Sequence, residues 1–182
     1  MREVDRRSKY NRRVFLQGAA VTVPVVAIAT SAGLSIDGAW AENAKALSPS
    51  TLKTLVKMAR DIYPHDSLAD SYYITAIAPW DDKAAKDPAV KTLLEDGVKN
   101  LDQSAKAKHK QSYIEVGWED DRVSLLRAIE PSDFFKRIRK DLEVSLYNQP
   151  SVWPKFGYEG PSAEYGGYIH RGFDDIDWLP KS

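Results

Sequence analysis

Residues that are typical of helix starts and helix ends recur along the middle of the chain. They restrict this part of the chain to a helical fold. Ser48 followed by Pro49 is typical of a helix N-terminus, because a serine can cap the first turn and proline fits the first helical position. Pro64 predicts the end of this helix. Apolar residues recur between them at helical spacing, namely Leu52, Leu55, Val56, Ala59, Ile62 and Tyr63.

A second start pattern is formed by Asp87 and Pro88. The apolar residues that follow again fall on one face of a helix: Val90, Leu93, Leu94, Val98 and Leu101. Gly97 lies on this apolar face. We expect it to permit the close approach of a neighbouring element, since glycine carries no side chain.

A shorter helix is predicted before Pro131 and a further helix after it. The first is indicated by Trp118, Leu125, Leu126 and Ile129 and stops at the proline. Ser132 can cap the second, and Asp133 in its first turn is favoured by the helix dipole. The predicted buried side of this last helix consists of Phe134, Phe135, Ile138, Leu142 and Leu146.

No run of residues alternates clearly between polar and apolar, as a half-buried strand would. The predicted fold class is therefore all-α, a small helical bundle followed by a long irregular C-terminal segment rich in Gly, Pro and aromatic residues. The geometry of residues 66–86 is left open, because Pro79 interrupts the helical pattern there.

The N-terminal residues have the layout of a twin-arginine export signal, in which two adjacent arginines precede a mildly apolar run. The residues that form this pattern are Arg12, Arg13, Phe15 and Leu16. This route carries proteins that are already folded, usually because they hold a cofactor inserted in the cytoplasm. The twin-arginine translocase is therefore an expected partner, and the periplasm is the expected location.

The apolar run itself, residues 18–36, contains 19 residues without a charge. A helix of this length would reach about 28 Å, close to the thickness of a bilayer core, so length does not exclude a membrane anchor. Composition favours a removable signal, because 12 of the 19 residues are Gly, Ala, Ser, Thr or Pro. Ala39 and Ala41 form a small-x-small cleavage site. Cleavage after Ala41 is predicted, with an uncleaved anchor as the alternative.

This interpretation divides the chain into three parts: a signal peptide at 1–41, a helical domain at 42–147 and an irregular segment at 148–182. The leader holds six Lys or Arg and three Asp or Glu, which leaves 20 basic and 23 acidic residues in 42–182. This balance gives no support to nucleic-acid binding. The chain has no Cys and three His, which excludes a disulfide framework, a thiolate metal site and covalent haem attachment.

The last 35 residues differ in kind from the helical part. They contain five of the ten glycines and four of the ten prolines, which argues against regular structure. They are also too aromatic for a typical disordered tail. The rings belong to Trp153, Phe156, Tyr158, Tyr165, Tyr168, Phe173 and Trp178.

Such a segment must bury its rings either against its own helices or against another protein. Tyr, Trp and Arg are the residue types most enriched in protein interfaces. The candidate docking residues are Trp153, Tyr158, Tyr168, Arg171, Phe173 and Trp178. Packing on the chain's own helices remains the alternative for each ring.

Catalytic, cofactor-binding and metal-binding residues are not predicted in this chain. His170 stands near Asp174, Asp175 and Asp177, but the spacing of these carboxylates does not match a calcium loop, and no triad partner can be placed beside the histidine. His65 lies in Pro64-His65-Asp66, where we expect a helix-ending turn whose side chains satisfy free backbone groups.

The chain resembles the gluconate 2-dehydrogenase subunit 3 family over most of residues 48–180. The resemblance is specific at Pro64-His65-Asp66 and in the C-terminal segment, and between them it is only a general helical pattern. The C-terminal motifs that carry it are Gly157-Tyr158-Glu159-Gly160, Gly166-Gly167-Tyr168, Gly172-Phe173-Asp174 and Trp178-Leu179-Pro180.

This resemblance implies a small exported subunit of a periplasmic flavin-dependent dehydrogenase. Its partner would be a large FAD-binding subunit of the glucose-methanol-choline type, often together with a c-type cytochrome, and the FAD would be held by that large subunit. The small subunit would escort the folded flavoprotein through export. Two alternatives from other classes are a periplasmic carbohydrate-binding module and an independent enzyme that uses His65 and His170.

Overall fold

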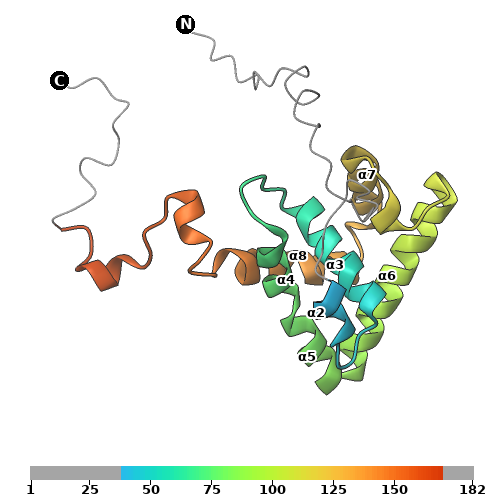
Figure 1. Cartoon of the computed structure of the whole chain (residues 1–182), viewed down its shortest axis with the longest axis horizontal. Coiled ribbons are helices and arrows are strands. Elements are labelled where there is room, and N and C mark those ends of the chain that lie inside the picture. The colour runs from blue at the N-terminus through green and yellow to red at the C-terminus, as the bar shows by residue number, and fades with distance from the viewer. Residues whose placement is uncertain (1–37, 170–182) are drawn as a thin grey trace, which may run out of the picture. The chain divides into compact units, whose positions relative to one another are not determined.

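The computed structural model describes residues 38–169, and these form helices and short 3-10 turns without any strand (Figure 1). The predicted all-α fold class is therefore confirmed for this part of the chain. The elements in chain order are α2 (Gly38–Glu42), α3 (Pro49–Ile62), α4 (Asp70–Ile77), α5 (Pro79–Lys86), α6 (Pro88–His109), η1 (Tyr113–Glu115), α7 (Glu119–Ile129), α8 (Asp133–Tyr147), η2 (Trp153–Phe156) and η3 (Ser162–Tyr165).

Helix α3 is the element around which the others pack. Its start is the predicted one, because the Ser48 hydroxyl accepts a hydrogen bond of 3.1 Å from the backbone N–H of Thr51. Helices α2, α4, α6, α7 and α8 all contact it. Leu52, Leu55, Val56 and Ala59 on its apolar face are buried, whereas Ile62 is partly buried. Each buried large aliphatic side chain there stabilises the fold by roughly 1.5–3 kcal/mol.

Residues 66–86, whose geometry the sequence left open, form the two short helices α4 and α5. Pro79 does not break a helix but occupies the first position of α5, where no backbone N–H is required. Ala78 keeps helical dihedrals (φ −49°, ψ −40°) and so joins the two helices directly. This arrangement brings Trp80 into the core, where it is fully buried between Lys83 and Arg137.

Helix α6 begins as predicted, with the Asp87 carboxylate accepting a 2.8 Å hydrogen bond from the N–H of Ala89. The expectation of a close approach at Gly97 is confirmed. The ring of Phe134 from α8 lies directly over this glycine, so that an added Cβ atom would overlap the ring. The missing side chain thus sets how near α6 and α8 can come.

Helices α7 and α8 flank Pro131 as predicted, and the five apolar residues assigned to the buried side of α8 are all buried. Trp118, one of the residues that indicated this helix, lies just outside it. Trp118 precedes the first turn with an extended backbone (φ −81°, ψ 131°), and 80% of its surface is exposed. Leu125 and Leu126 are buried in the core, and the partly buried Ile129 packs against it.

After α8 the described chain has no further α-helix, and residues 148–169 contain only two 3-10 turns and irregular backbone. This agrees with the density of Gly and Pro in the sequence. Across residues 38–169, no helix combines the length and the apolar character that crossing a membrane requires.

Candidate docking surface

The irregular segment is attached to the helical body at its root. Val152 is fully buried. The side-chain amide of Gln149 donates hydrogen bonds to the carbonyl oxygens of Tyr72 (3.0 Å) and Ser145 (2.9 Å). The indole N–H of Trp153 donates a further bond of 2.9 Å to the carbonyl oxygen of Tyr147. Residues 149–153 are therefore a fixed base for the segment that follows.

An aromatic cluster formed by His65, Tyr147 and Phe156 lies at this base. Nε2 of His65 is 2.7 Å from the hydroxyl oxygen of Tyr147, and the Phe156 ring packs edge-on to His65 with centroids 5.0 Å apart. Burial lowers the pKa of His65 and raises the pKa of Tyr147, so both groups are neutral near pH 7.

The role expected for the His65 side chain is wrong, although α3 does end just before it. The ring bonds to Tyr147 of α8 rather than to a free backbone group of the turn. The turn is closed by other atoms, because the N–H of Leu68 donates to the carbonyl oxygen of His65 and the hydroxyl of Tyr73 donates to that of Tyr63. A partner 82 positions away along the chain could not be read from local spacing.

From Phe156 onward the segment presents large apolar side chains to solvent. The exposed fractions are 46% for Phe156, 46% for Tyr158, 51% for Tyr165, 57% for Tyr168 and 74% for Ile169. We refer to these five residues as the aromatic patch. Charged residues are sparse between 148 and 169, where Lys155, Glu159 and Glu164 are the three that occur. Protein interfaces share both properties, an enrichment in Tyr and a depletion of charge.

The backbone that carries the aromatic patch has a defined local structure. Gly157 ends the first 3-10 turn at φ +71°, a conformation that other residues rarely adopt. Gly160 is buried beneath Trp153 and Tyr165, and the hydroxyl of Tyr165 donates a 2.9 Å hydrogen bond to the carbonyl oxygen of Glu159. Preformed turns of this kind reduce the conformational entropy that a partner would have to remove.

The six candidate docking residues divide into three groups. Trp153 is half-buried on its own chain and packs edge-on against Tyr158, with ring centroids 5.4 Å apart. Packing on its own chain therefore explains most of the burial of this side chain. Tyr158 and Tyr168 are exposed, as a docking role requires. Arg171, Phe173 and Trp178 lie outside the described residues.

A buried charged cluster, which sequence reasoning missed, lies in the core between α3 and α7. The carboxylate of Asp61 accepts hydrogen bonds from Nε and Nη2 of Arg122 (2.8 and 2.9 Å) and from the hydroxyl of Tyr113 (2.7 Å). Nη1 of Arg122 donates to the carbonyl oxygens of Val116 and Gly117. No local pattern in the sequence points to this cluster, because Asp61 and Arg122 are 61 positions apart.

The protonation states of this cluster are fixed by their surroundings. Burial, and then the charge of Asp61, raises the pKa of Tyr113. Burial alone would lower the pKa of Arg122, but the hydrogen bonds and charge of Asp61 outweigh it and raise that pKa. Because the Asp61 carboxylate already accepts three hydrogen bonds, it is not free to act as a general base. The role of the cluster is structural: it holds α7 and the loop before it against α3.

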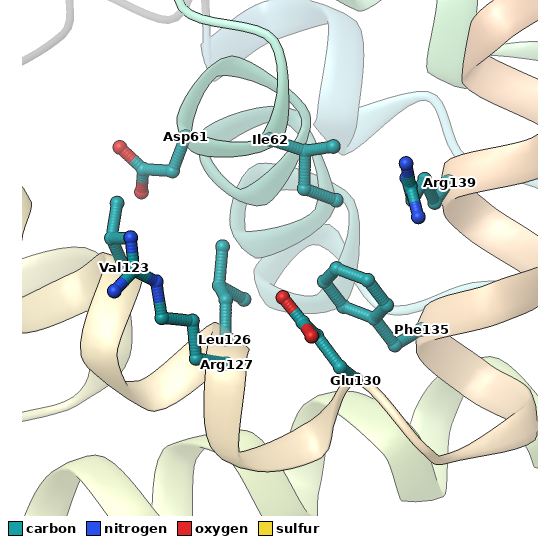
Figure 2. A pocket seen from close by; sticks show the side chains of 8 residues that line it. All are labelled: Asp61, Ile62, Val123, Leu126, Arg127, Glu130, Phe135 and Arg139. Carbon is teal, nitrogen blue, oxygen red and sulfur yellow. The ribbon is translucent and has the colours of Figure 1, made fainter.

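A cavity of about 260 Å³ opens next to this cluster. Figure 2 shows apolar side chains from α3, α7 and α8 at its centre, with charged side chains around them. Its lining residues are Asp61, Ile62, Val123, Leu126, Arg127, Glu130, Phe135 and Arg139. The cavity offers an apolar floor and mixed charges at its rim, but it does not pair a nucleophile with a base among the described residues.

Several predicted site residues cannot be placed. Arg12, Arg13, Phe15 and Leu16 of the export signal and His170 of the enzyme alternative lie outside residues 38–169. Within that range, no three His, Asp or Glu side chains converge as a metal site would require. Ala39 and Ala41 of the predicted cleavage site both belong to α2, and Ala41 is fully buried.

Comparison of the chain with models of protein families, with curated proteins and with solved structures finds no match.

Proposed function

We propose that this chain is a non-catalytic small subunit that docks onto a large FAD-containing dehydrogenase subunit and escorts it through twin-arginine export to the periplasm. The observation that carries the proposal is the aromatic patch, which presents exposed rings on a preformed, nearly uncharged backbone anchored at Val152 and Trp153. Rings held in this way supply contact area at a low cost in conformational entropy.

The size of the aromatic patch indicates how much of the interface it supplies. A fully buried aromatic side chain removes roughly 150–250 Å² from solvent, and about half of each of the four rings is exposed. The rings therefore contribute roughly 400 Å², against about 800 Å² per partner in an interface of standard size. A stable complex requires a second contact region, for which Arg171, Phe173 and Trp178 are the candidates that follow next in the chain.

The chemistry in this proposal belongs to the partner. A large subunit of the glucose-methanol-choline type would bind FAD and remove a hydride from a sugar, a sugar acid or another alcohol, and a c-type cytochrome would accept the electrons. The described residues of the small subunit contribute binding surface. Since a ligand that binds only the folded state shifts the folding equilibrium, docking also stabilises the large subunit.

Mild affinity purification of the C-terminally tagged chain from a periplasmic extract tests the proposal. The expected product is a yellow complex with a large co-purifying subunit and the absorbance spectrum of a flavin. The variant Tyr158→Ala/Tyr168→Ala is expected to lose this partner, because interface aromatics often contribute 2 kcal/mol or more each, about 30-fold in affinity. Trp118→Ala removes a ring before α7 that is more exposed than either tyrosine, at 80% of its surface, and serves as the control.

A colourless single chain that leaves the dehydrogenase activity in the extract would contradict the docking proposal. Loss of the partner in the Trp118→Ala control but not in the Tyr158→Ala/Tyr168→Ala variant would contradict the assignment of the aromatic patch to the interface.

A periplasmic carbohydrate-binding module is a second candidate, and the half-exposed rings of Phe156 and Tyr158 favour it, since aromatic faces stack on sugar rings. The indole of Trp153, which contacts Tyr158, provides a fluorescent reporter. Titration with monosaccharides and with short oligosaccharides should then change the tryptophan emission in a saturable way, and Trp153→Phe should abolish the change, because the chain has four other Trp. A carbohydrate-binding module is rejected if millimolar sugar leaves the emission unchanged.

A further inference from the structure

The bond predicted for signal cleavage, between Ala41 and Glu42, lies inside a folded element. Both residues belong to α2, and Ala41 has no exposed surface. Trp40, the residue between the two small residues of the cleavage pattern, is half-buried and packs against the hydrophobic core. The cleavage pattern is thus built into the helical domain rather than into a free leader.

The backbone around this bond is occupied by hydrogen bonds. The carbonyl oxygen of Ala41, which belongs to the scissile bond itself, accepts a 3.2 Å bond from the N–H of Ala44. The carbonyl oxygen of Trp40 accepts a bond of 3.3 Å from Asn43. On the other side of the bond, the Glu42 carboxylate lies 3.3 Å from Nζ of Lys53 on α3.

The residues just after α2 are fixed by a single carboxylate. Asp81 of α5 accepts hydrogen bonds from the consecutive N–H groups of Lys45 (2.6 Å), Ala46 (3.0 Å) and Leu47 (2.8 Å). We refer to residues 45–47 as the strap. Asp81 is 8% exposed and Leu47 is 3% exposed, so the carboxylate and the Leu47 end of the strap are shielded from water, whereas Lys45 is exposed. A carboxylate that accepts several backbone bonds makes stronger bonds than a neutral acceptor would.

A protease binds its substrate in an extended conformation, with alternate side chains in pockets and the scissile carbonyl in an oxyanion hole. Ala39 and Ala41 lie on the same side of the chain only when the backbone is extended, because side chains two residues apart diverge on a helix. Cleavage therefore requires α2 to leave the core, to unwind and to release the Ala41 carbonyl from Ala44.

We infer that the folded domain protects the bond between Ala41 and Glu42, so that a chain exported in the folded state keeps Trp40 and Ala41 as part of its core. This inference rests on the export route of the proposed function, and it concerns only this chain. The bonds to Asp81 are the proposed lock, because they hold Lys45, Ala46 and Leu47, which follow α2 closely in the chain, against α5.

Signal peptidase in detergent micelles can be offered two substrates, the purified full chain and a synthetic peptide covering residues 28–50. The expected result is that the peptide is cut after Ala41 and that the folded chain is cut at least ~10-fold more slowly, as intact mass reports. Equal rates would overturn the inference. Failure to cut the peptide would also overturn it, because the resistance of the bond to the peptidase would then not depend on the fold.

Asp81→Asn removes the charge that the strap binds. Asp82→Asn is its control, because among the described residues the side chain of Asp82 bonds to the exposed Nζ of Lys45 and to no backbone N–H of the strap. Cleavage of Asp81→Asn is expected at least ~10-fold faster than that of the unaltered chain, with Asp82→Asn unchanged. Equal protection in both variants would show that Asp81 is not the lock.

The exported chain gives a direct readout that is independent of any partner. Its intact mass is expected to show an N-terminus before Trp40, and an N-terminus at Glu42 would overturn the inference. The proposed docking fails separately, by the absence of a flavoprotein in the affinity purification, so the two failures can be told apart.

Discussion

The hydroxyl oxygen of Tyr147 lies 2.7 Å from Nε2 of His65 and joins the last residue of α8 to the turn after α3. Phe156 covers the pair, with its ring centroid 5.0 Å from that of His65 and 5.9 Å from that of Tyr147. The contact that closes the helical core is therefore also the contact on which the C-terminal segment begins.

Replacing Tyr147 by Phe keeps the ring but removes its hydroxyl. We expect the free energy of unfolding to fall by about 1 kcal/mol, the usual contribution of one hydrogen bond. Urea denaturation followed by circular dichroism measures this change. Tyr72→Phe is the control, since its hydroxyl has no hydrogen-bond partner among the described residues, and a loss of equal size there would mean that the His65 bond contributes nothing specific.

Stability should depend on pH through His65. Burial lowers the pKa of His65 in the folded state below its ordinary value of 6.5, so the unfolded chain takes up a proton first as the pH falls. The free energy of unfolding should thus decrease from about pH 7 downward until the folded-state pKa is reached. His65→Phe keeps a ring without titrating, and the difference between the two pH profiles isolates this effect.

Gly97→Ala tests the close approach of α6 and α8. Alanine favours a helix by about 1 kcal/mol over glycine, but its Cβ would overlap the Phe134 ring, so a net destabilisation of about 1–3 kcal/mol is expected. Gly117→Ala has no atom within 4 Å of the new Cβ and should change stability by less than about 0.5 kcal/mol. A stabilised Gly97→Ala variant would show that the Phe134 ring moves aside freely.

Arg122→Leu should be among the most damaging single changes in the helical part. It leaves the Asp61 carboxylate buried without its ion-pair partner, at an expected cost of about 3–5 kcal/mol. Glu42→Gln breaks the exposed pair with Lys53 and should cost less than about 1 kcal/mol. Chemical denaturation of both variants gives the comparison, and similar losses would contradict the assigned burial of the Asp61–Arg122 pair.

The escort proposal makes a prediction about location. Changing Arg12 and Arg13 to Lys should leave both this chain and the large dehydrogenase subunit in the cytoplasm, because only this chain would present the twin-arginine pattern. Immunoblots of the cytoplasmic and periplasmic fractions measure it, with a twin-arginine protein of another complex as the control. A large subunit that reaches the periplasm normally in this variant would remove the escort role.

Local patterns predicted the helices well, because caps and apolar spacing act over a few residues. The hydroxyl of Ser132 accepts from the N–H of Phe135 in the way that the cap pattern indicates. Pro79 shows the limit of such patterns, since a proline that starts a helix and a proline that breaks one look alike in the sequence. Which of the two occurs depends on tertiary contacts, and here the helix that Pro79 starts carries the fully buried Trp80.

The candidate sites were harder to predict, because they depend on contacts between distant residues. The Asp61–Arg122 pair spans 61 positions, and nothing in the spacing of the sequence distinguishes these two charges from those on the surface. In the C-terminal segment, composition correctly indicated irregular backbone, but it could not separate Trp153, which packs on its own chain, from Tyr158, which is exposed.

The position of α8 has a consequence for the order of events during synthesis. This helix contributes Phe134, Phe135, Ile138, Leu142 and Leu146 to the core and packs on α3, α4 and α6. A nascent chain that has not yet reached Tyr147 leaves those three helices with an open apolar face. The helical core is therefore complete only after Tyr147 has been synthesised, so that it closes shortly before the residues of the aromatic patch leave the ribosome.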